Sequence, residues 1–167
     1  MSNIRVAGIV NDSITDGVGL RMVIFTQGCP HKCAGCHNPQ THSFDGGVEM
    51  SSQQIIDEIA STSIITGVTL SGGEPMCQAK ALLPVAEYVK SRGLHLCVYS
   101  GYTYDRLLTM GDDVQRLLDY VDVLVDGPFV LSEKSLNLKF MGSKNQRPID
   151  IKKTREAGAI TLAEGWY

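Results

Sequence analysis

The amino-acid sequence predicts an α/β protein whose parallel strands form a partial, open (β/α) barrel. Short apolar runs alternate with segments of helical periodicity, and each run ends in a loop that contains glycine. The runs are apolar throughout, as expected for parallel strands that are buried on both faces. The chain has 167 residues, whereas a complete eight-stranded barrel typically takes ~250. We therefore expect an open barrel that forms a single domain over residues 1–167.

The first half of the chain should contain two strands and one helix. A run rich in β-branched residues, 21–27, indicates a buried strand that stops at a Gly-Cys-Pro turn. Ser51 and Gln54 have the spacing of a capping box, so a helix with isoleucines on one face should begin there. A second strand, 67–70, then leads into the glycine-rich turn 71–75.

The second half should continue the alternation. A helix over 79–92 has an apolar face and ends at Gly93, a residue type that often terminates helices. A third strand, 94–99, and a helix, 113–120, precede a fourth strand over 121–125.

The tail shows a weaker pattern. Strands over 138–141 and 160–163, with a short helix over 152–157 between them, are the elements we expect there. We find no internal repeat, linker or low-complexity segment, which agrees with one domain.

The charge pattern excludes some classes of function. Fifteen basic and eighteen acidic residues give a net charge of −3 and a pI near 5.8. A nucleic-acid-binding protein normally shows a basic excess or stripe, so nucleic acid is not an expected partner. The sequence has no run near the ~20 apolar residues of a membrane span and no signal-peptide pattern. We expect a cytoplasmic protein that does not bind membranes.

Three of the five cysteines lie within eight residues, at Cys29, Cys33 and Cys36. They follow the first strand, and ligands of parallel α/β proteins gather beyond the carboxyl ends of the strands. Three thiolates in one loop select an iron–sulfur cluster or zinc. Zinc would need a fourth ligand, for which His31 and His37 are candidates. An iron–sulfur cluster on three cysteines would keep one iron open for a substrate or cofactor.

The remaining cysteines and histidines indicate no second site. Cys77 could be a fourth ligand but is better interpreted as a packed thiol, and Cys97 lies in a predicted strand and should be a core residue. The four histidines are interpreted singly as solvated or packed: His31, His37, His42 and His95.

The cysteine spacing together with the turn 72–75 resembles the radical S-adenosylmethionine (SAM) superfamily. Within it, the segments 16–21, 28–30 and 36–39 resemble the glycyl-radical-enzyme activases. The segments that resemble the activases of anaerobic ribonucleoside-triphosphate reductase are 100–102, 125–129 and, most specifically, 142–147. The resemblance extends from about residue 4 to residue 150.

The resemblance implies a set of site residues. A [4Fe–4S] cluster would be held by Cys29, Cys33 and Cys36, and the amino and carboxylate groups of SAM would chelate the fourth iron. The remaining residues would contact SAM: the backbone of Gly72, Gly73 and Glu74 its amino group, Gly35, Cys36 and His37 its adenine, and Asp126 with the turn to Pro128 its ribose and methionine end.

The resemblance also implies a reaction. One electron from the reduced cluster would cleave SAM to methionine and a 5′-deoxyadenosyl radical, which would take a hydrogen atom from a glycine Cα of the reductase. A low-potential donor such as flavodoxin would supply the electron. No general acid or base is needed, so we expect no catalytic residue beyond the cluster ligands. An open barrel would admit the glycine-bearing loop.

Two positions depart from the broader family pattern, and other functions stay open. Gly35 stands where many members have an aromatic residue, and Pro128 stands where activases of the pyruvate formate-lyase kind have lysine. The alternatives are an activase of another glycyl radical enzyme, a small-molecule radical SAM enzyme of the deazapurine synthase type, an iron–sulfur electron carrier and a zinc-stabilised binding module.

Overall fold

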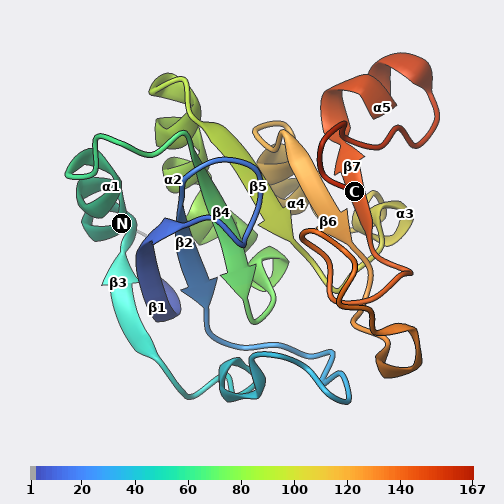
Figure 1. Cartoon of the computed structure of the whole chain (residues 1–167). Coiled ribbons are helices and arrows are strands. Elements are labelled where there is room, and N and C mark those ends of the chain that lie inside the picture. The colour runs from blue at the N-terminus through green and yellow to red at the C-terminus, as the bar shows by residue number, and fades with distance from the viewer. Residues whose placement is uncertain (1–2) are drawn as a thin grey trace.

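The computed structural model describes residues 3–167, which form one seven-stranded sheet flanked by helices (Figure 1). The strands are β1 (Asn3–Ser13), β2 (Arg21–Thr26), β3 (Val48–Ser51), β4 (Gly67–Gly72), β5 (His95–Tyr99), β6 (Val123–Asp126) and β7 (Arg147–Asp150). The α-helices are α1 (Ser52–Ala60), α2 (Ala79–Ser91), α3 (Tyr104–Leu107), α4 (Asp112–Leu118) and α5 (Ile151–Ala157). Short 3₁₀ helices are η1 (Pro39–Thr41), η2 (Pro75–Gln78) and η3 (Leu131–Glu133).

The strand order across the sheet is β3-β1-β2-β4-β5-β6-β7. The central four strands, β2, β4, β5 and β6, are parallel, and their arrowheads point to the same end of the molecule in Figure 1. The predicted α/β fold with parallel strands is therefore confirmed. The strands β1, β3 and β7 pair antiparallel with their neighbours, so the sheet is mixed at its margins.

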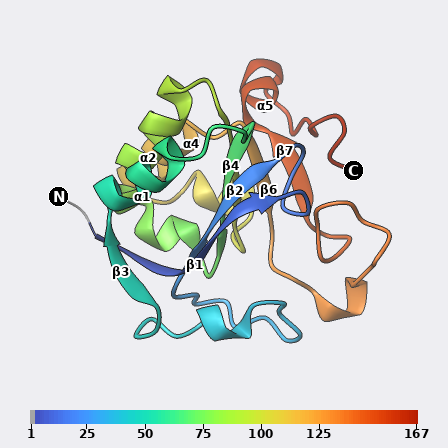
Figure 2. The same ribbon diagram turned by 60° about the vertical axis from the view of Figure 1, so that its left-hand side comes forward.

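The two faces of the central strands have different surroundings, because successive side chains point to opposite faces. Leu70, Val98 and Leu124 belong to the large core beneath α1, α2 and α4. Figure 2 shows these helices on one side of the sheet and the loop after β6 on the other. The second face buries a smaller cluster that includes Cys97 and Trp166. Burial on both faces explains the continuous apolar runs.

Most predicted elements are present with shifted ends. Helix α1 begins as predicted: Gln54 N–H donates to Ser51 Oγ at 3.1 Å, and Ser51 N–H donates to Gln54 Oε1 at 2.8 Å. Helix α2 ends at Ser91, shortly before Gly93, whose φ is +70°. The predicted helices 113–120 and 152–157 correspond to α4 and α5. No helix within residues 3–167 is long and apolar enough to cross a membrane.

The margins of the sheet differ from the prediction. Strands β1, β3 and β7 have no predicted counterpart, whereas 138–141 is irregular and 160–163 contributes one bridge, Ile149 to Leu162. Strand β7 is only four residues long, contains Pro148 and lacks an apolar run. It exists because it pairs with β6, and such pairing between distant segments leaves no local pattern.

Candidate functional site

A cavity of about 290 Å³ lies where the parallel strands end. Its wall is formed by the loops after β2, β4 and β5, by the connection between β6 and β7, and by residues of the loop before β2. The wall includes three cysteines, three histidines and the two glycines of the turn after β4: Cys29, Cys33, Cys36, His31, His37, His42, Gly72 and Gly73. The structure thus brings together the two segments that the sequence singled out.

The segment 28–42, which we call the cysteine loop, leaves the end of β2 and returns beside it. Gly28 N–H donates to the Thr41 carbonyl at 2.7 Å, and Cys29 N–H donates to the His42 carbonyl at 3.1 Å. These two hydrogen bonds close the base of the loop. They hold Cys29 and His42 side by side at the mouth of the barrel.

The three cysteine side chains line the cavity with different exposure. Cys29 is buried, which raises the pKa of its thiol, whereas Cys33 and Cys36 are half-buried. Within residues 3–167 no group of three His, Cys, Asp or Glu side chains converges on a single metal ion. An iron–sulfur cluster binds cysteine thiolates, and all three cysteines line this one cavity.

The glycine turn after β4 is shaped by its contact with β2. A Cβ on Gly72 would lie 2.6 Å from Thr26 N, and a Cβ on Gly73 would lie 2.4 Å from the Gly28 carbonyl oxygen. Gly73 N–H donates to the Thr26 carbonyl, and Glu74 N–H donates to the Gly28 carbonyl, both at 2.8 Å. Because both N–H groups are engaged, the turn can offer carbonyl oxygens to an ammonium group, which only donates.

The side chain of Glu74 is fully buried and serves the loops rather than the cavity. Its carboxylate accepts from His31 Nε2 at 2.6 Å, from Ser100 Oγ at 2.9 and 3.1 Å, and from Gly101 N–H at 2.8 Å. It also accepts from Met76 N–H at 3.1 Å. One carboxylate therefore joins the cysteine loop to the loops after β4 and β5. No local pattern in the sequence indicates this role of the Glu74 carboxylate.

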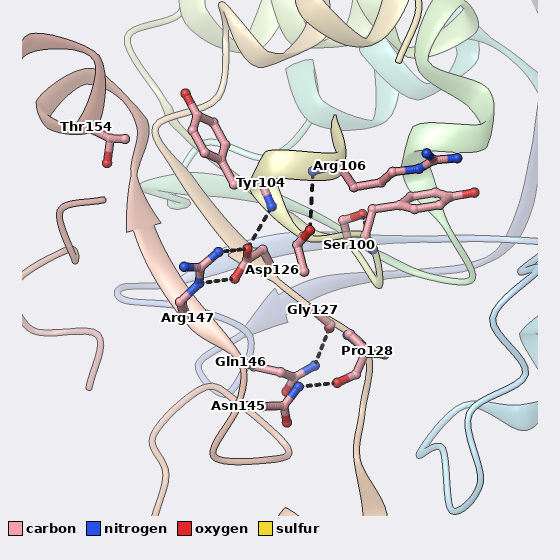
Figure 3. Close-up of polar contacts among 12 residues, drawn as sticks. Ser100, Tyr104, Arg106, Asp126, Gly127, Pro128, Asn145, Gln146, Arg147 and Thr154 are labelled. Carbon is pink, nitrogen blue, oxygen red and sulfur yellow. Dashed lines mark hydrogen bonds and ion pairs between the residues drawn. The ribbon is translucent and has the colours of Figure 1, made fainter. Parts of the chain in front are cut away.

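The Asp126 carboxylate also has a structural role, since it binds groups from two other segments. Arg147 binds it with two hydrogen bonds, Nε to Oδ1 at 3.0 Å and Nη2 to Oδ2 at 2.6 Å, and Tyr104 N–H donates to Oδ2 at 2.8 Å (Figure 3). The Asp126 side chain is 1% exposed and is not among the cavity-lining residues. The expectation that Asp126 itself faces the ribose is not supported, whereas its neighbour Gly127 lines the cavity.

The segment 142–147 fastens the turn that follows β6. Gln146 Nε2 donates to the Gly127 carbonyl at 3.1 Å, and Asn145 Nδ2 donates to the Pro128 carbonyl at 2.7 Å (Figure 3). Gln146 Oε1 accepts from Gly142 N–H at 2.9 Å, which closes the segment on itself. The polar residues of this motif therefore hold one wall of the cavity in place.

The connection between β6 and β7, residues 127–146, packs against the cysteine loop, and we call it the excursion. The rings of Phe129 and His37 have centroids 5.2 Å apart. A Cβ on Gly35 would lie 2.7 Å from Leu131 Cδ1, so the excursion occupies the space where an aromatic side chain at position 35 would begin. Lys139 of the excursion reaches the cavity wall. This excursion closes part of the opening left by the incomplete barrel.

The other cysteines lie outside the cavity wall. Cys97 is fully buried, as predicted, and burial raises the pKa of its thiol to about 12. Cys77 lies within η2 and is exposed as a residue, so the expectation of a packed thiol is wrong. Burial of its sulfur nevertheless raises the pKa of Cys77 to about 11.

Comparison with known proteins identifies the family. The 4Fe–4S single cluster domain family matches residues 15–149. The anaerobic ribonucleoside-triphosphate reductase-activating protein of Haemophilus influenzae is 38% identical over 142 residues, which cover 80% of this chain and 89% of that protein. The chain belongs to the radical SAM family of glycyl-radical-enzyme activases.

Other members of the activase family and one solved structure are also similar. The pyruvate formate-lyase-activating enzyme of Listeria monocytogenes is 33% identical over 152 residues, which cover 87% of this chain and 60% of that enzyme. The crystal structure of QueE from Escherichia coli matches 60% of this chain and 53% of its own, with a TM-score of 0.48 and 19% identity.

Proposed function

We propose that this activase generates the glycyl radical of an anaerobic ribonucleoside-triphosphate reductase. The observation that carries the proposal is the shared cavity, in which the three-cysteine loop meets the glycine turn after β4. The similarity to the Haemophilus protein over 89% of its length favours this reductase as the target. The chain is similar to a smaller part of the Listeria enzyme, which makes pyruvate formate-lyase the alternative target.

In this proposal a [4Fe–4S] cluster is held by Cys29, Cys33 and Cys36. The donor set fits, because iron–sulfur clusters are held by thiolates and the three thiols share one cavity. The chemistry supplied by the bound cluster and SAM is one-electron cleavage of SAM followed by removal of a hydrogen atom from a glycine Cα. The protein supplies orientation and shelter from water.

Most of the proposed SAM contacts line the cavity, namely Cys36, His37, Gly72 and Gly73, whereas Gly35 and Glu74 are their chain neighbours outside the cavity wall. The carbonyl oxygens at Gly72, Gly73 and Glu74 receive its ammonium group, and the segment Gly35, Cys36 and His37 lies beside its adenine. The ring of His37 is supported by Phe129, which limits its rotation. Asp126 acts indirectly, by anchoring the turn that carries Gly127.

We also propose a cellular setting for this protein. It forms one domain over residues 1–167 and acts in the cytoplasm. A low-potential donor such as flavodoxin supplies its electrons. The reductase glycine enters at the open side of the barrel, where the excursion between β6 and β7 leaves the cavity accessible. Nucleic acid and membranes have no role in the reaction.

The test is anaerobic incubation of the reconstituted protein with SAM, a strong reductant and the reductase. We expect a glycyl radical in the electron paramagnetic resonance (EPR) spectrum and 5′-deoxyadenosine as a product. Cys33→Ala should lose iron and the radical, while the matched control Cys77→Ala should keep both, because Cys77 lies outside the cavity wall. A radical on pyruvate formate-lyase alone would favour the alternative target. Consumption of a small metabolite without a protein radical would refute the activase proposal.

A further inference from the structure

The cavity wall contains an aromatic ring that the hydrophobic core does not use. Within residues 3–167, three phenylalanine or tyrosine residues line the cavity: Tyr99, Phe129 and Phe140. Tyr99 and Phe140 pack against the smaller cluster that includes Trp166, and the Tyr99 hydroxyl donates to the Phe140 carbonyl at 2.7 Å. Phe129 is half-buried and belongs to neither hydrophobic cluster of the described residues. Its ring therefore adds apolar surface to the cavity without contributing to either core.

Three neighbours define the position of the Phe129 ring. Its centroid lies 5.2 Å from that of the His37 ring, and His37 directly follows Cys36. A Cβ on Gly142 would lie 3.0 Å from Phe129 Cδ1, and a Cβ on Gly35 would lie 3.3 Å from Phe129 Cε2. Cys36, His37 and Gly142 line the cavity as well. The ring is thus the part of the wall next to the third cysteine.

The backbone at Gly35 explains why this ring comes from the excursion. Gly35 has φ +73°, a conformation that residues with a Cβ rarely adopt. Its Cβ would also lie 2.7 Å from Leu131 Cδ1. A side chain at position 35 is therefore excluded both by the backbone and by the available space. The position just before the third cysteine cannot supply an aromatic ring, and the excursion places Phe129 and Leu131 against the glycine instead.

We infer that Phe129 is the aromatic contact for the adenine of SAM in this activase. The inference rests on the proposed function, which places SAM in this cavity and its adenine beside residues 35–37. Adenine is a flat aromatic base, and proteins commonly hold such bases against aromatic side chains. Tyr99 and Phe140 are packed against the smaller cluster, so Phe129 is the ring that meets the base. Phe129 is then a SAM-binding residue contributed by the excursion.

The experiment measures the dissociation constant of SAM by calorimetry after anaerobic reconstitution, together with iron content. Phe129→Ala removes the ring, Phe129→Leu keeps apolar bulk without a ring, and Phe129→Tyr keeps the ring. Leu131→Ala is the matched control, because Leu131 also packs against Gly35 but is 52% exposed and lies outside the cavity wall. A second titration uses L-methionine, which has no adenine, and follows the EPR spectrum of the reduced cluster.

We expect Phe129→Ala to retain iron and to bind SAM about tenfold more weakly, as for base–aromatic contacts in other proteins. Phe129→Leu should have an intermediate affinity, and Phe129→Tyr should bind SAM as the wild-type protein does. Leu131→Ala should also keep the wild-type affinity. The L-methionine titration should be the same in the wild-type protein and in Phe129→Ala, since the affected contact is to adenine.

Wild-type SAM affinity in Phe129→Ala would overturn the inference. An equal loss in Leu131→Ala, or an equal weakening of L-methionine, would also overturn it, because a general loosening of the loops would then be the cause. If Phe129→Ala loses iron, the other two variants decide, and equal SAM affinity in Phe129→Leu and Phe129→Tyr overturns the inference. Wild-type SAM affinity with loss of the glycyl radical would assign Phe129 to the contact with the reductase instead. Failure of the wild-type protein to bind SAM would count against the proposed function.

Discussion

At the scale of single residues, the buried carboxylates position loops. Glu74 is fully buried and Asp126 is 1% exposed, and each accepts several hydrogen bonds from segments distant in sequence. A buried carboxylate is costly unless its oxygens are paired, so each of these networks forms only when the loops around it are correctly placed.

His31 gives the first prediction at this scale. Its hydrogen bond to Glu74 ties the middle of the cysteine loop to the sheet. His31→Ala should leave the three thiols in place but loosen the loop and weaken SAM binding by about tenfold, since a bond to a charged group contributes ~1.5–3 kcal/mol. Calorimetric titration with SAM and the EPR signal of the reduced cluster measure the change. His31→Gln, whose amide can donate, should restore much of the affinity, and equal binding in all three proteins would contradict the prediction.

A second residue-scale prediction concerns pH. Arg21 Nη2 donates to His95 Nδ1 at 2.9 Å, so the ring proton lies on Nε2. Burial, together with the charge of Arg21, lowers the pKa of His95 from 6.5 to about 4. Between these values the unfolded chain binds a proton that the folded chain does not, so stability should fall as the pH drops from about 6.5 toward 4.

His95→Asn keeps an acceptor near the Nδ1 position but cannot titrate. Urea unfolding of the two proteins at pH 7 and pH 5 should therefore show a smaller loss of stability in the variant. The same loss in both proteins would show that other groups cause the acid sensitivity.

At the scale of elements, the close approach of β2 and β4 determines where glycine is required. The two strands pair in parallel up to Thr26 and Gly72, and their backbones remain in contact beyond the last pair. Gly72 has φ +87°, a conformation that side chains with a Cβ rarely adopt. Gly72 and Gly73 thus allow the loop after β2 and the loop after β4 to meet at the cavity. This structural requirement holds independently of any contact with a ligand.

Gly73→Ala tests this contact. Its Cβ would lie 2.4 Å from the Gly28 carbonyl oxygen, so the two loops must separate. We expect destabilisation of ~1–3 kcal/mol, as for overpacking elsewhere, together with weaker SAM binding. Urea unfolding and titration with SAM measure the two effects. Gly111→Ala is the control, because its Cβ meets nothing within 4 Å. Full stability in Gly73→Ala would show that the loops can adjust freely.

At the scale of the whole molecule, the C-terminal segment closes the inner face of the open barrel. The Trp166 ring stacks on His95 with centroids 5.6 Å apart, lies 5.6 Å from the Arg21 guanidinium carbon and meets Phe140 edge-on at 5.3 Å. Trp166 is 4% exposed. A residue close to the end of the chain therefore covers side chains of β2 and β5 where the barrel has no further strands.

Trp166→Ala should cost ~3–5 kcal/mol of stability, the range for removing a large buried aromatic side chain. Trp166→Phe should cost less, because it retains much of the apolar area and the stacking on His95. Thermal or urea unfolding measures both variants. Because Trp166 lies outside the cavity wall, iron content at low temperature should stay at the wild-type level in both. If Trp166→Ala lowers the free energy of unfolding by less than ~1 kcal/mol, the packing of Trp166 on the side chains of β2 and β5 contributes little to stability.

The sequence by itself determined the parallel core, the capped helix α1 and the cysteine and glycine segments of the site. Each of these depends on local information: apolar runs of strand length, cap residues at fixed spacing and a characteristic cysteine motif. Only the tertiary structure decided the structural roles of Glu74, Asp126 and the segment 142–147. These residues form hydrogen bonds between segments that are far apart in the chain. A local sequence pattern cannot predict which distant segments will pair.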